Sequence, residues 1–264
     1  MVTVEEIFNF LEKLAPSFLA DTWDNVGLLV GNPKKKVKTI LFALSISKKV
    51  ILEAKEKNVD LIITHHPVTL KGEKRFLPDS YVYMLINNKI AHIALHTNLD
   101  ISDISPSMEI AQSLALKKVE PLATDEPKYG LIGLFEGNFD TLLNTLKKSK
   151  ALAKDVYRIV KPIDFEKLLK RKKLTVAICS GSGESLIKDA IFKGAQIYIS
   201  GDIKYHAALE AKDKGLCILD LGHYGTEFYF FKPILEDLKN EYPNIDYLIS
   251  QVDTSPFETL NLRP

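Results

Sequence analysis

Short runs of continuous apolar residues alternate with amphipathic helical patterns along most of this 264-residue chain. A strand that is apolar on both faces must be covered by helices on both faces, which is typical of a parallel sheet. The pattern therefore predicts an α/β fold with largely parallel sheets flanked by helices. The predicted strands are residues 39–46, 59–64, 90–95, 174–179, 195–200 and 216–221, and the predicted helices are residues 48–58, 81–88, 184–194, 204–215 and 226–240.

The two halves of the chain resemble each other. Residues 39–66 can be laid over residues 175–202 at a constant offset and without gaps, so that KNVDLIIT falls on KGAQIYIS. The match is one of residue type, and two unrelated βαβ units can look alike in this way. We predict two similar α/β lobes that arose by internal duplication, residues 1–125 and 174–264. A strand–helix–strand segment, residues 126–173, is expected to connect them and pack on the lobes.

The composition argues against several classes of protein. The net charge is +1 at pH 7, and no basic cluster is interleaved with aromatic residues, so nucleic-acid binding is not supported. No run of 18 apolar residues and no signal-peptide pattern occurs, so we expect a cytoplasmic protein without a membrane span. Cys179 and Cys217 lie in apolar runs without metal-type spacing, and we interpret them as core residues.

Polar residues cluster after the predicted strands, at the edge where open parallel sheets bind their ligands. The clusters are HHP (65–67), GDIKYH (201–206), HTNLD (96–100) and GHYGTE (222–227). On a regular strand the side chains of His65 and His66 would point to opposite faces. Just beyond the strand, with Pro67 bending the chain, both can reach into one crevice, each toward a different metal ion.

Five side chains from these clusters are candidate metal ligands: His65, His66, Asp100, His223 and Glu227. Imidazole and carboxylate are natural ligands of Zn, Mn, Fe and Ni. A helix that begins near His223 would place His223 and Glu227 on one face. Five ligands exceed what one catalytic zinc takes and suit two metals bridged by a carboxylate and a water. We predict two divalent cations per subunit, with Zn, Mn, Fe, Ni and Mg all left open.

Two further histidines are candidate catalytic residues for proton transfer, His96 and His206. His96 precedes Asp100 by four residues, and a purely structural hydrogen bond would explain it equally well. His206 begins a predicted helix after the strand that corresponds to the one before the histidine pair. His92 lies inside an apolar strand and is interpreted as a core residue.

Two other segments carry weaker signals. In DTWDN (21–25), Asp24 could orient a ligand histidine through its second ring nitrogen, although a turn with a buried indole explains the segment nearly as well. In SGSGES, Gly181 and Gly183 could cradle a phosphate at a helix start. That segment lacks the Lys-Ser/Thr of a P-loop and the third glycine of a dinucleotide fingerprint.

The motifs THHP, HTNLD, SGDIKYHAALEA and DLGHYGTE, with DTWDNVGLLVG near the start, resemble the NIF-three-like family in sequence and order. Members of that family are often named GTP cyclohydrolase 1 type 2 homologues. The resemblance covers essentially the whole chain. It implies a two-lobed, internally duplicated α/β fold, a dinuclear divalent-metal site and self-association into a ring-shaped homohexamer. It maps the metal ligands onto the same five residues and makes Glu227 the bridging carboxylate.

One segment departs from the family pattern. Many members follow HTNLD with a Gly-x-Asn element, whereas this chain reads ISDISPSMEIAQSLA, in which Ser105 and Ser107 are candidate helix caps. The departure alters the expected pocket rim, so it bears on the substrate more than on the metals.

Three functions are compatible with these residues. The first is a metal-dependent hydrolase that acts on a nucleotide-type substrate, as the GTP cyclohydrolase name implies. The second is a metal-dependent phosphoesterase. The third is a metal-binding oligomeric scaffold or regulatory protein without turnover. Loss of turnover when His66 or Glu227 is replaced would separate the first two from the third.

Overall fold

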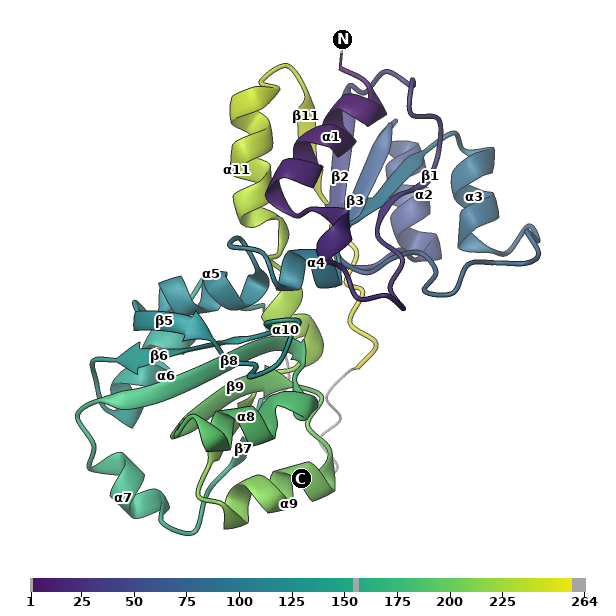
Figure 1. Cartoon of the computed structure of the whole chain (residues 1–264). Coiled ribbons are helices and arrows are strands. Elements are labelled where there is room, and N and C mark those ends of the chain that lie inside the picture. The colour runs from purple at the N-terminus through teal and green to yellow at the C-terminus, as the bar shows by residue number, and fades with distance from the viewer. Residues whose placement is uncertain (1, 154–156, 258–264) are drawn as a thin grey trace, which may run out of the picture. The chain divides into compact units, whose positions relative to one another are not determined.

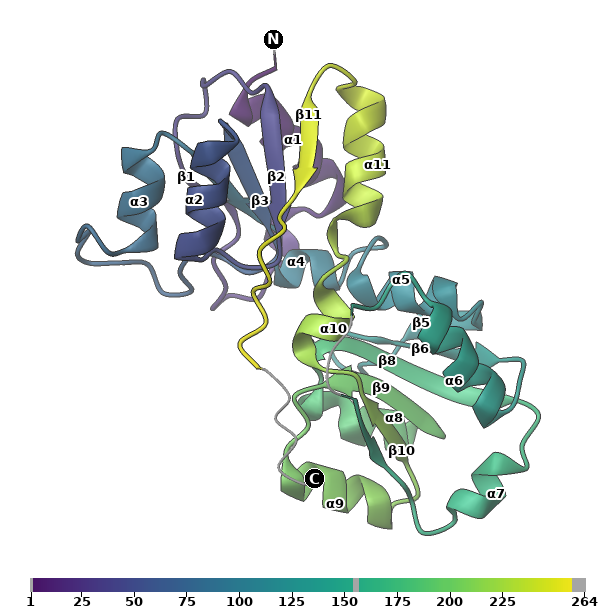
Figure 2. The same cartoon turned by 180° about the vertical axis from the view of Figure 1, so that it is seen from behind.

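The structure is a computed structural model that describes residues 2–153 and 157–257 (Figure 1, Figure 2). The described chain divides into two compact units. The first contains residues 2–104 and 230–257, and the second contains residues 105–153 and 157–229. Both are sheets flanked by helices, which confirms the α/β fold class. Within the described ranges, no helix has both the length and the apolar character needed to cross a membrane.

The first unit is built on a five-stranded sheet in the order β1-β4-β3-β2-β11. Four strands run parallel, and only the edge strand β1 is antiparallel to its neighbour. Its elements are α1 (Val4–Leu14), η1 (Ser17–Leu19), β1 (Gly27–Val30), β2 (Thr39–Ala43), α2 (Lys48–Glu56), β3 (Leu61–Thr64), α3 (Tyr81–Asn87), β4 (Ala91–Ala94), α4 (Thr97–Asp100), α11 (Phe231–Glu241) and β11 (Asp246–Ile249).

Helices cover both faces of this sheet, as its apolar strands require. The side chains of Leu41 and Ile62 pack against Val50 of α2 and Leu85 of α3 on one face. Helices α1 and α11 cover the other face (Figure 1, Figure 2). Local signals set the helix starts: the side chain of Ser47, for example, accepts a hydrogen bond from the backbone of Val50 and so caps α2.

The second unit is built on a six-stranded sheet in the order β5-β6-β8-β9-β10-β7. Strands β8, β9 and β10 are parallel, whereas β5, β6 and β7 join through antiparallel pairs. Its elements are α5 (Pro106–Ser113), β5 (Lys117–Pro121), β6 (Leu131–Phe135), α6 (Phe139–Lys148), β7 (Arg158–Val160), α7 (Phe165–Leu169), β8 (Leu174–Ser182), η2 (Glu184–Leu186), α8 (Ile187–Phe192), β9 (Ile197–Gly201), α9 (Tyr205–Asp213), β10 (Cys217–Asp220) and α10 (His223–Glu227).

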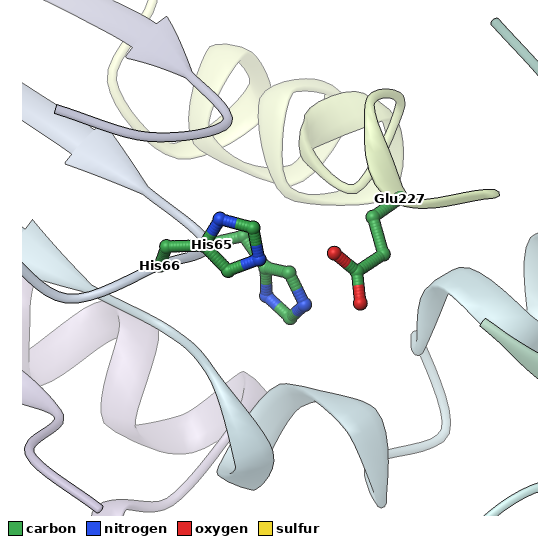
Figure 3. A group of neighbouring side chains, drawn as sticks. All are labelled: His65, His66 and Glu227. Carbon is green, nitrogen blue, oxygen red and sulfur yellow. The ribbon is translucent and has the colours of Figure 1, made fainter. Parts of the chain in front are cut away.

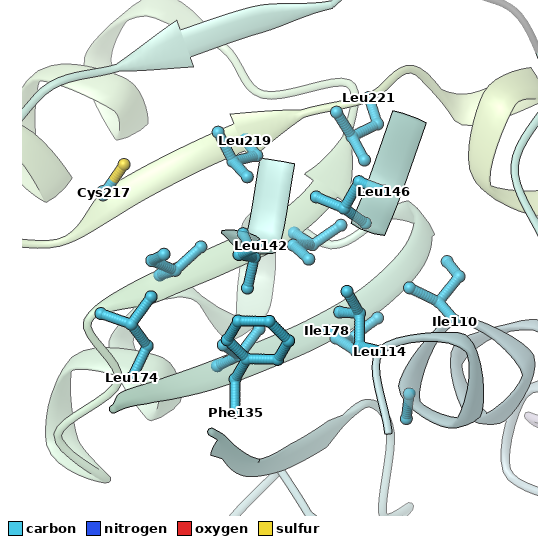
Figure 4. Packing of buried hydrophobic residues seen from close by; sticks show 14 of the residues in the cluster. Ile110, Leu114, Phe135, Leu142, Leu146, Leu174, Ile178, Cys217, Leu219 and Leu221 are labelled. Carbon is cyan, nitrogen blue, oxygen red and sulfur yellow. The ribbon is translucent and has the colours of Figure 1, made fainter. Parts of the chain in front are cut away.

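Two apolar clusters hold the second unit together. Figure 4 shows the larger one, in which side chains of α5, α6 and α7 pack on one face of β8, β9 and β10. Ala177, Tyr198 and Ile218 point to the opposite face and pack against α8 and α9. Cys217 is fully buried, as predicted for a core residue, and Cys179 is half-buried. Burial raises the pKa of the Cys217 thiol to about 12, which keeps it unreactive.

The same four-strand arrangement occurs in both units. In β1-β4-β3-β2 and in β7-β10-β9-β8, three parallel strands follow one another in the chain. The strand that comes before each set in the chain, β1 or β7, pairs antiparallel with the last strand of the set, β4 or β10. The aligned ranges 39–66 and 175–202 each contain a strand, a helix and a parallel strand. This shared topology is consistent with the internal duplication.

The unit boundaries and the second sheet differ from the sequence expectations. The predicted connecting segment, residues 126–173, supplies β6 and β7 to the second sheet, where they pair with β8 and β10. The C-terminal residues 230–257 return to the first unit because β11 pairs with β2. The second sheet is therefore mixed and not largely parallel. Strand pairing over such distances is invisible to local periodicity.

The predicted helix 226–240 is divided into α10 and α11. Pro233 lies in the first turn of α11, where its missing N–H is tolerated, so the sequence favours a new helix start at this point. Ser105 caps α5 by accepting a hydrogen bond from Met108, as expected. Ser107 does not cap the helix, because its hydroxyl accepts a hydrogen bond from the Ser180 backbone instead.

Candidate metal centre

The histidine pair follows β3 directly, and both rings have one nitrogen fixed by a neighbour. His65 is fully buried, and its Nδ1 lies 2.6 Å from the carbonyl oxygen of Leu95. A carbonyl only accepts, so Nδ1 carries the proton and Nε2 keeps its lone pair for a metal. His66 Nδ1 lies 2.7 Å from the Ser45 hydroxyl. The two ring centroids are 5.3 Å apart, which confirms that the bend after β3 brings both rings together.

A third imidazole, that of His96, joins this pair. Its centroid lies 5.3 Å from that of His65 and 5.6 Å from that of His66. His96 precedes α4, and its Nδ1 lies 2.9 Å from each carboxylate oxygen of Asp24. Asp24 thus orients His96, a candidate proton-transfer residue, whereas the sequence suggested that it would orient a ligand histidine. Asp100, at the end of α4, places Oδ1 3.5 Å from His65 Nε2.

The carboxylate of Asp24 has no exposed surface, yet it stays ionised. Burial by itself would raise its pKa. Hydrogen bonds from His96 and Thr97, with the charge of His96, outweigh that effect and hold the pKa of Asp24 well below its usual value. The indole of Trp23, the preceding residue, is 56% exposed and meets the His96 ring edge to face at 6.0 Å. The alternative of a buried indole is therefore excluded.

In the second unit, α10 carries two candidate ligands one helical turn apart. His223 Nε2 lies 2.9 Å from Glu227 Oε2, and His223 Nδ1 lies 2.8 Å from Asp202 Oδ2. Glu227 is buried, with 4% of its surface exposed. Burial by itself would lower the pKa of His223, but the hydrogen bonds and charges of Glu227 and Asp202 raise the pKa to about 10. The raised pKa favours an imidazole that is protonated on both nitrogens, with Nδ1–H donating to Asp202 and Nε2–H donating to Glu227.

Two glycines allow the backbone to approach these ligands. A Cβ at Gly181 would lie 1.9 Å from Glu227 Oε1, and Gly181 has a φ of +66°. A Cβ at Gly201 would lie 2.5 Å from the backbone nitrogen of His223. The phosphate cradle suggested for Gly181 and Gly183 is not supported. Their backbone N–H groups already donate to the hydroxyls of Thr226 and Ser200.

Three of the predicted ligands form a group that could hold a metal ion. His65, His66 and Glu227 each offer one ligand atom, and these atoms all lie within 4.8 Å of one another. Figure 3 draws these three side chains. Metal–ligand bonds of about 2.0–2.2 Å place neighbouring ligand atoms within such a distance, so this donor set fits a divalent ion.

The remaining histidines lie elsewhere in the fold. His206 is exposed at the start of α9, where its ring contacts that of Tyr205. His92 is fully buried in β4, as expected, and burial lowers its pKa to about 3, so it is neutral. Its Nε2 lies 2.7 Å from the hydroxyl of Thr64, which in turn donates to the backbone carbonyl of His66.

Both the sequence and the fold of this chain are similar to those of known proteins. The sequence profile of Duf34/NIF3 (NGG1p interacting factor 3) matches residues 2–256. The chain belongs to the Duf34/NIF3 family. A relative from Streptococcus pneumoniae named "GTP cyclohydrolase 1 type 2 homolog" is 35% identical over 265 residues, covering 96% of this chain and 97% of that protein. A relative of the same name from Campylobacter jejuni is 34% identical, covering 90% and 92%.

A solved structure agrees with the fold. The structure described as reduced HcgD from Methanocaldococcus jannaschii superimposes with a TM-score of 0.82 at 30% identity. The match covers 95% of this chain and 98% of that one. The family membership inferred from the motifs is therefore confirmed.

Two residues that contact the candidate ligands were missed by sequence reasoning, Ser45 and Asp202. Both follow strands at the same edge as the ligands. The internal alignment contained a signal for them, because Asp202 corresponds to His66 and Ser45 corresponds to Gly181. In the first unit Ser45, after β2, lies beside His66, and in the second unit Asp202, after β9, lies beside His223.

We expect Asp24→Asn to lower the free energy of unfolding by about 2 kcal/mol at pH 7, because a buried acceptor of several hydrogen bonds loses its charge. The folded-state pKa of Asp24 is depressed, so its contribution is present above the unfolded-state pKa of about 3.9 and is lost as pH falls. The difference in unfolding free energy between wild type and Asp24→Asn should thus be smaller by about 1 kcal/mol at pH 3 than at pH 7.

Urea unfolding of chelator-treated protein between pH 3 and pH 8 measures this gap. The control is Asp103→Asn, the same change at an exposed position, which should leave the stability unchanged at every pH. A gap that stays constant down to pH 3 would show that Asp24 is not held ionised by His96 and Thr97.

Proposed function

We propose that this chain binds two divalent cations through His65, His66, Asp100, His223 and Glu227, and hydrolyses a nucleotide-type substrate. The observation that carries the proposal is the grouping of His65, His66 and Glu227, whose ligand atoms lie within 4.8 Å of one another. The names of the relatives, which are homologues of a GTP cyclohydrolase, support the substrate class.

The hydrogen bonds of the ligands support the same proposal. His65 and His223 each have Nδ1 bonded to an acceptor-only oxygen, which fixes the ring so that Nε2 is the nitrogen that would bind the cation. The raised pKa of His223 shows that its surroundings attract positive charge. To hold a divalent ion, His223 would have to lose the proton on Nε2, because metal ligands must be deprotonated. Glu227, close to His223 and grouped with the other two histidines, is the proposed bridging carboxylate.

Divalent ions held by these residues would lower the pKa of a coordinated water and polarise the bond under attack. The chain supplies the proton transfer. Asp24 keeps a proton on Nδ1 of His96, so His96 Nε2 is free to accept a proton from the attacking water and later donate it to the leaving group. We propose His206 as a second proton-transfer group, because its exposed position at the start of α9 allows it to contact a substrate.

The test joins metal analysis to a turnover screen. Purified protein should contain about two equivalents of a divalent metal, and it should hydrolyse at least one compound from a panel of GTP, other nucleotides and phosphoesters. Treatment with a chelator should abolish turnover, and added Zn²⁺ or Mn²⁺ should restore it. Absence of bound metal would refute the proposal. Bound metal without turnover on the whole panel would favour a metal-binding scaffold.

Self-association into a homohexamer and a cytoplasmic location stay predictions from the sequence. Neither is needed for the proposed chemistry, because the chain itself carries all five proposed ligands.

A further inference from the structure

The loop that contains Trp23 is tied down on both sides. The backbone nitrogen of Asp21 donates to the Thr97 hydroxyl at 3.0 Å, and Asp24 accepts from Thr97 and His96. The side-chain amide of Asn25 donates to the carbonyl of Thr69, in the segment that follows the histidine pair, at 2.8 Å. The backbone before Trp23 and the polar side chains after it therefore fix this loop to the first unit.

The indole itself does not contribute to the core. Trp23 is 56% exposed, although its immediate neighbour Asp24 has a fully buried carboxylate. Exposed single aromatic residues are ordinary on protein surfaces. Trp23 differs from them because its ring meets the His96 ring at 6.0 Å, and His96 lies beside His65 and His66. A large aromatic surface is thus held in a fixed place one ring away from two proposed metal ligands.

We propose that Trp23 is the platform on which a planar heteroaromatic ring of the substrate stacks, so that its reacting atom lies near the metal centre. This inference rests on the proposed function and adds a residue that selects the substrate class. Indole is the aromatic side chain with the largest stacking surface, and stacking accepts any purine or pyrimidine because each base has a π face. The same loop orients His96 through Asp24, so substrate position and proton transfer are set together.

The tryptophan fluorescence of the protein reports directly on stacking at Trp23, because Trp23 is the single tryptophan of the chain. Metal-loaded protein is titrated with guanosine monophosphate while the indole emission is followed, and with ribose 5-phosphate, which has the phosphate and sugar but no base. We expect saturable quenching by guanosine monophosphate and none by ribose 5-phosphate. Quenching by both compounds, or by neither at millimolar concentration, would overturn the inference.

Variants test whether the indole contributes to affinity. Equilibrium dialysis of guanosine monophosphate should show binding about tenfold weaker for Trp23→Ala and close to wild type for Trp23→Phe. The matched control is Phe192→Ala. Phe192 is 80% exposed at the end of α8, which runs from the carboxyl end of β8 to the opposite edge of the sheet from His223. This control should bind like wild type.

Metal analysis of the same samples separates the two proposals. If Trp23→Ala keeps both metals and binds guanosine monophosphate as tightly as wild type, the stacking inference is wrong and the metal centre stands. If the wild-type protein takes up no divalent metal, the proposed function fails, and the inference that rests on it fails as well.

Discussion

Replacing Glu227 by glutamine should remove metal binding and turnover while leaving the fold intact. Glu227 is buried, lies 2.9 Å from His223 and shares a group with His65 and His66. Glutamine has nearly the same shape but no negative charge, so two cations would face only one remaining carboxylate among the proposed ligands. Changes in residues that merely support a metal ligand cost about 10–100-fold in affinity or activity, and loss of a bridging ligand should cost more.

The measurements are metal content by elemental analysis and turnover on whichever compound the wild type hydrolyses. The matched control is Glu210→Gln, the same chemical change on the exposed face of α9. It should keep both metals and full activity. Thermal unfolding in the presence of a chelator should give the same midpoint for wild type and Glu210→Gln, and a lower midpoint but still a cooperative transition for Glu227→Gln, because glutamine loses the ion pair with His223. Two equivalents of metal in Glu227→Gln would refute the bridging role.

The helices and strands that carry the site were predictable because local chemistry dictates them. The parallel strands before the ligands are continuous apolar runs, and the turn after β3 is marked by Pro67. The HxxxE spacing predicted that His223 and Glu227 share a helix face, and α10 begins at His223 as required. These features depend on neighbours within a few residues, where periodicity and helix starts are informative.

The division into units could not be predicted in the same way. Strand β11 pairs with β2, and β6 pairs with β8, over separations that no local pattern encodes. A short strand such as DYLI does not specify by its own sequence which sheet it joins. The choice is made by side-chain packing across the whole sheet, so the unit boundaries follow from tertiary structure alone.

The partners of the ligands were predictable only in part. Asp24 was suggested by its type and motif, and its contact with His96 is present in the structure. Asp202 and Ser45 carry no motif of their own, and they contact His223 and His66 because their strands end at the ligand edge. The exposure of Trp23 could not be predicted from the sequence either. An indole next to an acidic residue is equally compatible with a buried turn and with an exposed ring.

The second large effect is expected at Gly181, whose backbone passes beside the Glu227 carboxylate. Gly181→Ala introduces a Cβ that would lie 1.9 Å from Glu227 Oε1, so the carboxylate must move away from its present place beside His223. The positive φ of +66° adds a strain of about 1 kcal/mol for any residue with a side chain. We expect metal affinity to fall by at least about tenfold, because a displaced carboxylate cannot hold the ion.

Gly194→Ala separates the effect of the clash with Glu227 from the effect of the backbone strain. Gly194 follows α8 with a φ of +71°, and a Cβ there would meet nothing within 4 Å, so this variant carries the backbone strain without the clash. Both variants should lose about 1 kcal/mol of unfolding free energy, with up to about 1 kcal/mol more for Gly181→Ala from its weakened His223–Glu227 bond. Only Gly181→Ala should lose metal in isothermal titration. Equal metal affinity in the two variants would show that the carboxylate at this position is not a ligand, since moving it would have changed nothing.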